Sequence, residues 1–498
     1  MTTPATAPLF PFDNSYAREL TGFYVEVSPD PAPEPTLLRL NRTLAEELGL
    51  DPDLLDSPLG ARIFAGSETP ANAEPIAQAY AGHQFGGFSP QLGDGRALLM
   101  GEVIDRHGRR RDIALKGSGA TPFSRGGDGK AAVGPVLREY ILGEGMHALG
   151  IPTTRALAAV RTGEWIRRDR RLPGAVLTRV AASHVRVGTF EFFACRGDTE
   201  KVRQLADYTI RRHYPEIADQ PNRYFELLRA VAARQAALIA RWTLVGFLHG
   251  VMNTDNMALS GETIDYGPCA FLEAYNPRAV FSSIDTGGRY SFRNQAPIAR
   301  WNLARLAETL LPLFDAPTRE DAIQLAMEVI NEFPKVYESS WLEGASRKLG
   351  FDSAHDEDAE LLEDWLDLLE EQAVDYTLAW RRLADAAEGN SEPLASLFAD
   401  PTPLNDWLSR WRQRGEKNSM PGGVARAQAM RCVNPLYIPR NHLVEEALTA
   451  ASERGDLTPF ERLLEAISLP FTERPGWEAY AEPAPRQFTA CYKTFCGT

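Results

Sequence analysis

The spacing of apolar residues divides the chain into a strand-rich part and a helical part. Between about residues 85 and 180, short apolar runs such as ALLMGEVI (97–104) and DIALK (112–116) alternate with glycine-rich turns, which is typical of strands joined by loops. From about residue 200 onward, apolar residues recur at i, i+3 and i+4, which predicts amphipathic helices. The pattern therefore predicts an α+β protein whose sheet precedes most of its helices.

Two segments depart from this division. Residues 136–150 carry apolar side chains on one face of a 3.6-residue period and end at Gly150, with a proline two residues further on, so they predict a helix within the strand-rich part. The proline-rich stretch 28–35 can form neither a regular helix nor a central strand, and we expect it to separate an N-terminal extension from the remainder of the chain.

The amino-acid composition limits the kinds of partner that the protein can bind. The 498 residues are 44% hydrophobic and 24% charged, as in ordinary globular proteins, and carry a net charge of −14. This charge argues against binding to nucleic acids or anionic membranes, so phosphate chemistry would need a local basic pocket. Neither a secretory signal nor a bilayer-spanning apolar run is recognisable. We therefore expect a soluble, cytoplasmic protein.

The five cysteines are too few for a disulfide scaffold and lack the CxxC spacing of metal sites. We expect most of them to be reduced and buried. Cys269 follows an Asp-x-Gly motif closely, and Cys496 is third from the end. A thiol on a mobile terminus can reach a partner elsewhere in the chain.

Two motifs in the strand-rich part suit phosphate binding. Gly93, Gly95 and Arg96 lie in a turn between two apolar runs; glycines allow backbone N–H groups to approach phosphate oxygens, and arginine adds a bidentate donor. Most such glycine pairs are merely hairpin turns. Lys116 ends the second run, as the nucleotide-binding lysine of protein kinases does, although strand-edge lysines are usually solvated charges.

A candidate partner for Lys116 and a candidate metal site lie further along the chain. The predicted helix offers Glu139 and Glu144; Glu139 flanks the apolar face, so we prefer it to Glu144 as the partner of Lys116. Taken alone, this motif would indicate an exposed surface glutamate. Asn256 and Asp265, the latter in Asp-Tyr-Gly, are the kind of oxygen ligands that Mg²⁺ accepts beside phosphates. The order of these motifs is that of a protein kinase.

The stretch HGVMNTDN (249–256) lacks the kinase base. With His249 and Asn256 set in the kinase pattern, the catalytic aspartate falls on Val251, which cannot accept a proton. Asp255 could replace it, or could instead order the loop by bonding its own backbone. A general base contributes only about 10²- to 10⁴-fold, so its loss need not abolish transfer.

Two loops contain further candidates for nucleotide contacts. Asp128 and Gly129 lie in a glycine-rich turn that could reach over a nucleotide, and Arg179 and Arg186 carry guanidinium groups that suit phosphate oxygens. Each segment, taken alone, is also typical of an ordinary loop. The basic run RRDRR (167–171) indicates a solvated turn.

With these residues assembled, the chain resembles the selenoprotein O family, which consists of kinase-fold proteins once counted as pseudokinases. The resemblance covers nearly the whole chain and rests on long, unusual strings. Among them are YAGHQFGGFSPQLGDGRA, LKGSGATPFSRGGDGK, GFLHGVMNTDNMALSGETIDYGPCAF and the terminal CGT.

The resemblance implies a protein adenylyltransferase that binds ATP in an orientation reversed relative to kinases and transfers AMP to protein hydroxyl groups. It also implies a bilobal, protein-kinase-like fold. The expected divisions are an N-terminal extension (1–75), an N-lobe with the nucleotide-binding loops (76–178), a C-lobe with the catalytic loop and metal site (179–315) and a helical C-terminal extension with a redox-active tail (316–498).

The same resemblance implies roles for individual residues. Asp255 would accept the proton, Glu139 would orient Lys116, and Asn256 and Asp265 would bind Mg²⁺, with Mn²⁺ as the alternative. Cys269 and Cys496 would form a disulfide, Cys496 standing where animal members carry selenocysteine. The nucleotide would be held by Gly93, Gly95, Arg96, Lys116, Asp128, Gly129, Arg179, Arg186 and Asp265.

Three functions stay open at this point. The first is AMP transfer from ATP to Ser, Thr or Tyr hydroxyls of proteins, with release of pyrophosphate. The second is a conventional kinase that transfers the γ-phosphate with Asp255 as base. The third is a nucleotide-binding pseudokinase that acts through partner binding and is gated by Cys269 and Cys496. The retained metal ligands and Lys116 disfavour the third, and only the family resemblance separates the first two.

Overall fold

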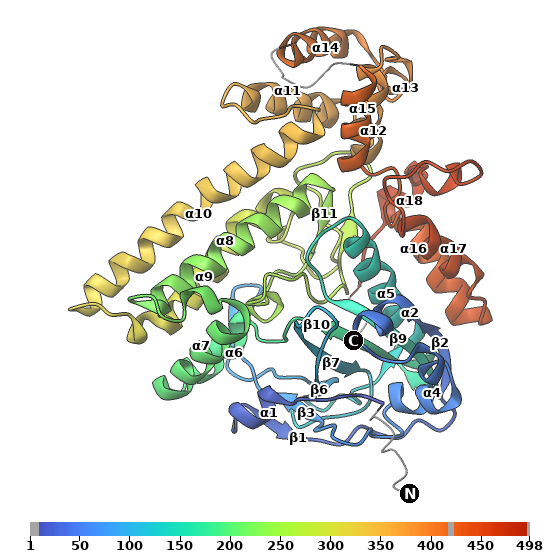
Figure 1. Ribbon diagram of the computed structural model, residues 1–498. Coiled ribbons are helices and arrows are strands. Elements are labelled where there is room, and N and C mark those ends of the chain that lie inside the picture. Colours follow the sequence, from blue (N-terminus) through green and yellow to red (C-terminus); the bar gives the residue numbers. More distant parts are fainter. Residues whose placement is uncertain (1–8, 417–422, 496–498) are drawn as a thin grey trace, which may run out of the picture.

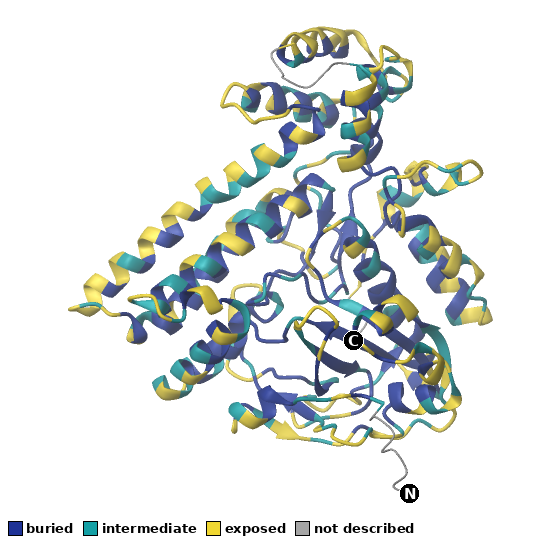
Figure 2. Cartoon of the chain, in the orientation of Figure 1, coloured by how far each residue is buried: buried dark blue, intermediate teal, exposed yellow. Residues whose placement is uncertain are grey.

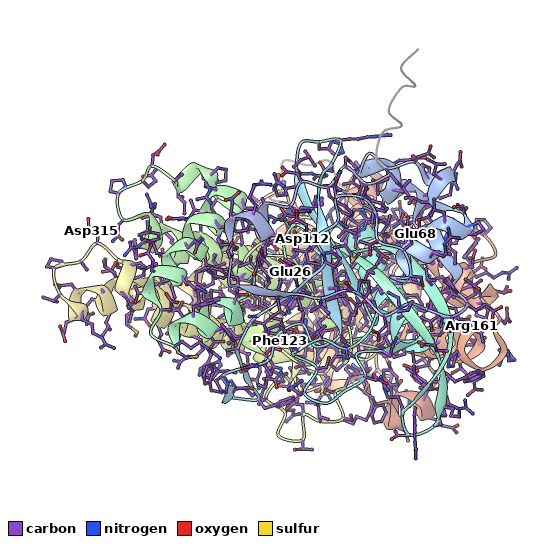
Figure 3. The ribbon with its side chains drawn as sticks, turned by 90° about the horizontal axis from the view of Figure 1, so that it is seen from below. Glu26, Glu68, Asp112, Phe123, Arg161 and Asp315 are labelled. Atoms are coloured by element: carbon purple, nitrogen blue, oxygen red, sulfur yellow. The ribbon has the colours of Figure 1, made fainter. Side chains whose placement is uncertain are left out.

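An antiparallel sheet of eight strands forms the first part of the protein (Figure 1). The computed structural model describes residues 9–416 and 423–495. The sheet has the order β1-β3-β6-β7-β10-β9-β2, with β8 beside β10. Glu26 in β1, Asp112 in β7 and Arg161 in β9 mark it in the view from below (Figure 3). The strands are β1 (Tyr24–Glu26), β2 (Thr36–Leu40), β3 (Ile76–Gln78), β6 (Ala97–Ile104), β7 (Arg110–Lys116), β8 (Ala131–Ala132), β9 (Arg155–Arg167) and β10 (Arg171–Ala181).

Helices cover both faces of this sheet, which is why its central strands are apolar on both sides. Helix α5 (Val133–Ala148) packs on one face, where Ala159 of β9 belongs to its core. The neighbouring Val160 belongs to the core under α2 (Arg42–Glu47), α3 (Pro52–Leu55) and α4 (Pro58–Phe64) on the other face. Adjacent residues of a strand point to opposite faces, so β9 is buried from both sides.

The second part is helical and carries the stretch 249–269 at its centre. A short antiparallel ribbon, in which Phe247 pairs with Phe271 and Leu248 with Ala270, brings the two ends of this stretch together. The ribbon consists of β11 (Phe247–Leu248) and β12 (Ala270–Phe271). The surrounding helices are α6 (Val187–Ala194), α7 (Thr199–His213), α8 (Arg223–Leu244), α9 (Gln295–Leu310) and α10 (Arg319–Lys348). The stretch 249–256 and the Asp-x-Gly motif at 265–267 are therefore anchored by the same ribbon.

The last part of the chain folds back onto α5. In α17, Phe460 meets the ring of Tyr140 of α5 edge to face, with ring centroids 5.7 Å apart. Figure 1 shows α11 to α15 at the far end of α10 and α16 to α18 beside α5, and Figure 2 shows exposed residues concentrated on the outer turns of these helices. Their bounds are α11 (Asp358–Glu371), α12 (Tyr376–Ala387), α13 (Glu392–Ala395), α14 (Thr402–Gly415), α15 (Val424–Val433), α16 (Asn441–Thr449), α17 (Thr458–Ile467) and α18 (Arg486–Cys491).

The predicted α+β class is confirmed, and the apolar run 97–104 coincides with β6. The helix expected at 136–150 begins earlier, at Val133, because Pro135 is tolerated in a first turn whose N–H groups need no helical partner. Residues 28–35 form neither helix nor strand, as expected. The division at residue 75 stays a prediction; β1 and β2, which precede it, are the edge strands of the sheet. None of the helices in the described ranges is long and apolar enough to cross a bilayer.

Arg440 joins three distant segments at a buried point. Its side chain is fully buried and donates to Glu273 Oε2 at 2.7 Å, to Asp375 Oδ2 at 2.6 Å and to the Ala481 carbonyl at 2.9 Å. Asp375 also caps α12 through the Leu378 N–H. These contacts tie the C-terminal extension to the segment after β12.

We expect Arg440→Met to reduce the free energy of unfolding by about 3–5 kcal/mol, because it leaves two buried carboxylates without their cation. Arg410→Met is the matched control, since Arg410 pairs with Asp364 at the exposed surface and such a pair contributes under about 1 kcal/mol. Thermal unfolding of both variants checks this. Equal shifts in the melting temperature would contradict a structural role for the buried pair.

Candidate active site

A cleft of about 560 Å³ lies between the sheet and the helical part, within the size range of small-molecule sites. Residues from both parts line it, and almost all the predicted site residues are among them. Glu139 lies behind Lys116, in contact with it. The predicted residues that line the cleft are Gly93, Gly95, Arg96, Lys116, Asp128, Gly129, Arg179, Arg186, Asp255, Asn256 and Asp265.

Four charged side chains meet at the wall of this cleft. Lys116 Nζ, at the end of β7, lies 2.5 Å from Glu139 Oε2 and 2.8 Å from Asp265 Oδ1. Arg179, on the neighbouring strand β10, donates its Nε to Glu139 Oε1 at 2.7 Å. Glu139 rather than Glu144 is thus the partner of Lys116; Glu144 binds Arg155 instead.

Charge balance holds the two carboxylates of this cluster in their ionised form. Burial would raise the pKa of Asp265, but Lys116, Arg179 and Arg96 outweigh burial and hold that pKa far below its usual range. Burial likewise opposes ionisation of Glu139, and Arg179 and Lys116 keep its pKa below normal. The cluster therefore presents two cations and two anions at neutral pH.

The glycine turn can form only with glycines at its two key positions. Gly93 has a φ of +76°, and a Cβ there would lie 2.3 Å from the ring of Phe123, which is labelled in Figure 3. A Cβ on Gly95 would lie 2.8 Å from the Phe123 carbonyl oxygen. Thr121 Oγ1 adds a hydrogen bond between the two segments, because it donates to the Asp94 carbonyl at 2.6 Å. The loop after Lys116 is therefore folded directly onto the turn.

Asp128 is held in an ion pair that the sequence did not suggest. Both its oxygens accept from Arg168, at 2.8 and 2.9 Å, and the hydrogen bonds from Arg168 lower the pKa of Asp128. Arg168 itself lines the cleft. The solvated turn predicted at 167–171 is present, but Arg168 within it also pairs with Asp128, which lies far away in the sequence.

Arg186 is fixed in the cleft by a ring and several oxygen atoms. Its guanidinium lies over the ring of Tyr80, 4.2 Å from the centroid, and 3.7 Å from Asp94 Oδ1. It also donates to the Asp255 carbonyl at 3.3 Å. Tyr80 lines the cleft too, and the prediction missed it, since an isolated tyrosine has no distinctive spacing.

Asp255 lies in a short 3₁₀ turn, Thr254–Asn256, with its side chain at the cleft. Oδ2 accepts from Gln84 Nε2 at 3.2 Å, whereas Oδ1 is buried and has no hydrogen-bond partner among the described residues. Burial raises the pKa of Asp255 to about 6, against the opposing effect of Arg186. The Val251 backbone carbonyl accepts from Asn256 Nδ2 at 3.0 Å, and Val251 also lines the cleft.

The residues predicted as metal ligands have donor atoms that fit Mg²⁺. The amide nitrogen of Asn256 is engaged with Val251, so its oxygen is left for a ligand. Asp265 has a φ of +69°, an unfavourable conformation for aspartate that tends to occur at functional sites. The described ranges contain no cluster of three or more His, Cys, Asp or Glu side chains suited to a metal. Further ligands would come from phosphates and water, as is usual for Mg²⁺.

Arg138, next to Glu139, holds the segment immediately after Asp265. Its Nε donates to the Gly267 carbonyl at 3.0 Å and its Nη2 to the Cys269 carbonyl at 2.6 Å. Thr494 Oγ1 donates to the intervening Pro268 carbonyl at 2.6 Å. The prediction missed Arg138, because its partners are carbonyls 129 and 131 positions away in the sequence.

Only one of the two predicted disulfide cysteines lies among the described residues. Cys269 is a buried, free thiol whose Sγ contacts the Tyr266 carbonyl, and burial raises its pKa to about 12. Cys496 lies outside the described residues. The Cys269 to Cys496 disulfide therefore stays a prediction.

A strand lysine paired with a helix glutamate, a glycine turn, a catalytic loop and an Asp-x-Gly define a kinase-like, nucleotide-dependent transferase. The family described as "Protein adenylyltransferase SelO" matches residues 9–468. The chain belongs to this family. The predicted kinase-like fold class and the predicted nucleotidyltransferase, an adenylyltransferase acting on proteins with ATP as donor, are thereby confirmed.

Similar proteins from several bacteria extend over the whole chain. A "Protein nucleotidyltransferase YdiU" of Cereibacter sphaeroides is 61% identical over 98% of this chain and 100% of its own length. Proteins of the same name from Chromobacterium violaceum and Rhizobium meliloti are 61% and 57% identical, over 95% and 98% of this chain and 99% of their own lengths. The likeness is thus not confined to one lobe.

We expect Arg138→Met to loosen the segment 265–272, because buried carbonyls lose their donor. One lost hydrogen bond of about 1.4 kcal/mol would speed hydrogen exchange there about tenfold. Exchange measured by mass spectrometry on peptides from this segment checks the expectation. Arg170→Met, which removes an exposed pair with Glu453, is the control and should leave these peptides unchanged. An unchanged rate in Arg138→Met would show that Arg138 does not hold the segment.

Proposed function

We propose that this cleft transfers AMP from ATP to Ser, Thr or Tyr hydroxyls of proteins and releases pyrophosphate. The observation that carries the proposal is the convergence of the charged cluster around Lys116 with Asp255 and Asn256 in one cleft. Mg²⁺ is the metal we expect, because the available donors are hard oxygens. A cytoplasmic location stays a prediction.

The transfer needs one bond made and one broken at the α-phosphorus of ATP. The acceptor hydroxyl oxygen attacks this phosphorus, its proton passes to Asp255 Oδ2, and the bond to pyrophosphate breaks, so that pyrophosphate leaves with the electron pair. Asp255 suits the role of proton acceptor because it lines the cleft immediately before Asn256. Phosphoryl-type transfer depends mainly on positioning and charge stabilisation.

The cations of the cleft bind and stabilise the phosphates. Arg96, Lys116, Arg179 and Arg186 all line it, and arginine forks match phosphate oxygens well. Glu139 keeps Lys116 directed into the cleft through their 2.5 Å contact. A metal ion held by Asn256 and Asp265 would neutralise charge that develops on the phosphates.

Labelled ATP separates AMP transfer from γ-phosphate transfer. With a bulk protein acceptor, we expect label from α-labelled ATP and none from γ-labelled ATP, because the β- and γ-phosphates leave as pyrophosphate. Label from the γ-position alone would instead establish a conventional kinase, and no label from either would support a pseudokinase. Lys116→Met serves as the inactive control, since it removes the central cation of the cluster.

We expect Asp265→Asn to lower kcat for AMP transfer by at least about 10²-fold, because the metal loses a charged ligand and the cluster gains net positive charge. Transfer rates across a Mg²⁺ titration check this, and the variant should need more metal. Asp315→Asn is the control, because Asp315 is an exposed residue at the far edge of the view in Figure 3. Activity of Asp265→Asn within about threefold of the parent would exclude Asp265 as a metal ligand.

A further inference from the structure

A small hairpin of the N-terminal part lies over the catalytic loop. It consists of β4 (Gly82–Gln84) and β5 (Gly87–Ser89), which pair with each other and are not part of the eight-stranded sheet. Phe85 and Gly86 at its tip have φ values of +52° and +85°. This conformation makes the reversal tight enough for Gln84 and Phe85 both to face the loop.

Three consecutive hairpin residues bind three consecutive residues of the catalytic loop. The His83 N–H donates to Thr254 Oγ1 at 2.7 Å, and the Phe85 N–H donates to Asn253 Oδ1 at 3.2 Å. Between them, Gln84 Nε2 donates to Asp255 Oδ2 at 3.2 Å. The partners are 168 to 171 positions apart in the sequence, so the fold itself aligns the two segments.

The hairpin is in turn fixed from behind. His83 Nδ1 lies 2.5 Å from Glu191 Oε1 of the buried helix α6, and Thr254 Oγ1 donates to the other oxygen of Glu191. The ring of Trp301 meets His83 edge to face, 5.1 Å between centroids. One carboxylate therefore locks both the hairpin and the loop, and Gln84 has little freedom to move relative to Asp255.

The surroundings of Asp255 leave one of its two carboxylate oxygens able to accept a proton from a substrate. A Cβ on Gly82 would lie 2.7 Å from Oδ1, so the hairpin backbone covers this oxygen closely. Oδ1 is buried and lacks a hydrogen-bond partner within the part of the chain that the structure describes. Oδ2, in contact with Gln84, is thus the oxygen left to receive a proton.

We infer that Gln84 is a positioning residue for Asp255. The inference rests on the proposed function, in which Asp255 accepts the hydroxyl proton. The neutral amide of Gln84 donates one hydrogen bond to Oδ2 and fixes the direction of the carboxylate without neutralising it. Gly82 is needed at its position because any larger residue would displace Oδ1.

Gln84→Met tests this inference, because methionine keeps the length of the side chain but cannot donate a hydrogen bond. We expect kcat for AMP transfer to fall about 10- to 100-fold, the range for a lost hydrogen bond to a charged group and a misplaced reactive group. The dissociation constant for ATP should stay within about twofold, since Gln84 acts through Asp255. Gln91→Met is the matched control, because Gln91 is exposed and does not line the cleft.

A double-mutant cycle with Asp255→Asn separates failure of the inference from failure of the proposed function. If Gln84 acts through Asp255, the double variant should be no slower than Asp255→Asn alone. A Gln84→Met enzyme with kcat within twofold of the parent, beside an Asp255→Asn enzyme whose kcat falls by at least about 10²-fold, would overturn the positioning role alone. An Asp255→Asn enzyme with full activity would show that Asp255 is not the base. Gln84 would then have no base to position.

A second substitution at the same position tests whether Gln84→Met acts merely by disturbing the fold. Gln84→Glu keeps the shape of the side chain but places a carboxylate against Asp255, so we expect kcat to fall further than in Gln84→Met. The melting temperature of each variant is measured beside kcat. If kcat falls only as far as the melting temperature falls across the variants, and ATP binding weakens as well, Gln84 has a structural role and the inference is contradicted.

Discussion

The electrostatic balance among Lys116, Arg179, Glu139 and Asp265 is the interaction on which the rest of the site depends. Each comes from a different element: a strand, its neighbour, α5 and the segment before β12. An unpaired charge at this depth would cost several kcal/mol, so the sheet, the helix and the helical part must dock in one arrangement. Because the four charges already cancel, the negative charge of a triphosphate must be met by further cations. Arg96, Arg186 and a metal ion would supply them, which gives a physical reason for a metal requirement.

The segments that carry Asn256 and Asp265 are held by contacts from distant parts of the fold. The hairpin residues 83–85 fix the loop before Asn256, and Arg138 and Thr494 fix the carbonyls after Asp265. Gln84 and Phe85 also line the cleft, whereas Arg138 and Thr494 do not. Loops that must place donor atoms to within fractions of an ångström gain from such supports, since the loop backbone alone does not define their position. The end of the described chain therefore also supports the Asp-x-Gly segment, through the contact of Thr494 with Pro268.

The sequence allowed prediction of those features that depend on local pattern or on motif order. Strand β6, the helix carrying Glu139, the glycine turn and the pairing of Lys116 with Glu139 all belong to this group, because periodicity and the kinase order of motifs express them directly. Arg168, Gln84 and Arg138 do not. Their partners Asp128, Asp255 and Gly267 are 40, 171 and 129 positions away, and no spacing rule connects such pairs. They become visible only when the fold brings the segments together.

The absence of an aspartate at Val251 is a consequence of packing rather than damage to a kinase loop. Val251 is buried within the main apolar core, and its carbonyl holds Asn256. A carboxylate at that position would be buried among apolar side chains and would be destabilised by desolvation. Asp255, four residues later, lies instead under a hairpin that leaves one oxygen usable. Under the proposed function, the proton acceptor has moved within the loop to Asp255, and the hairpin holds its carboxylate through Gln84.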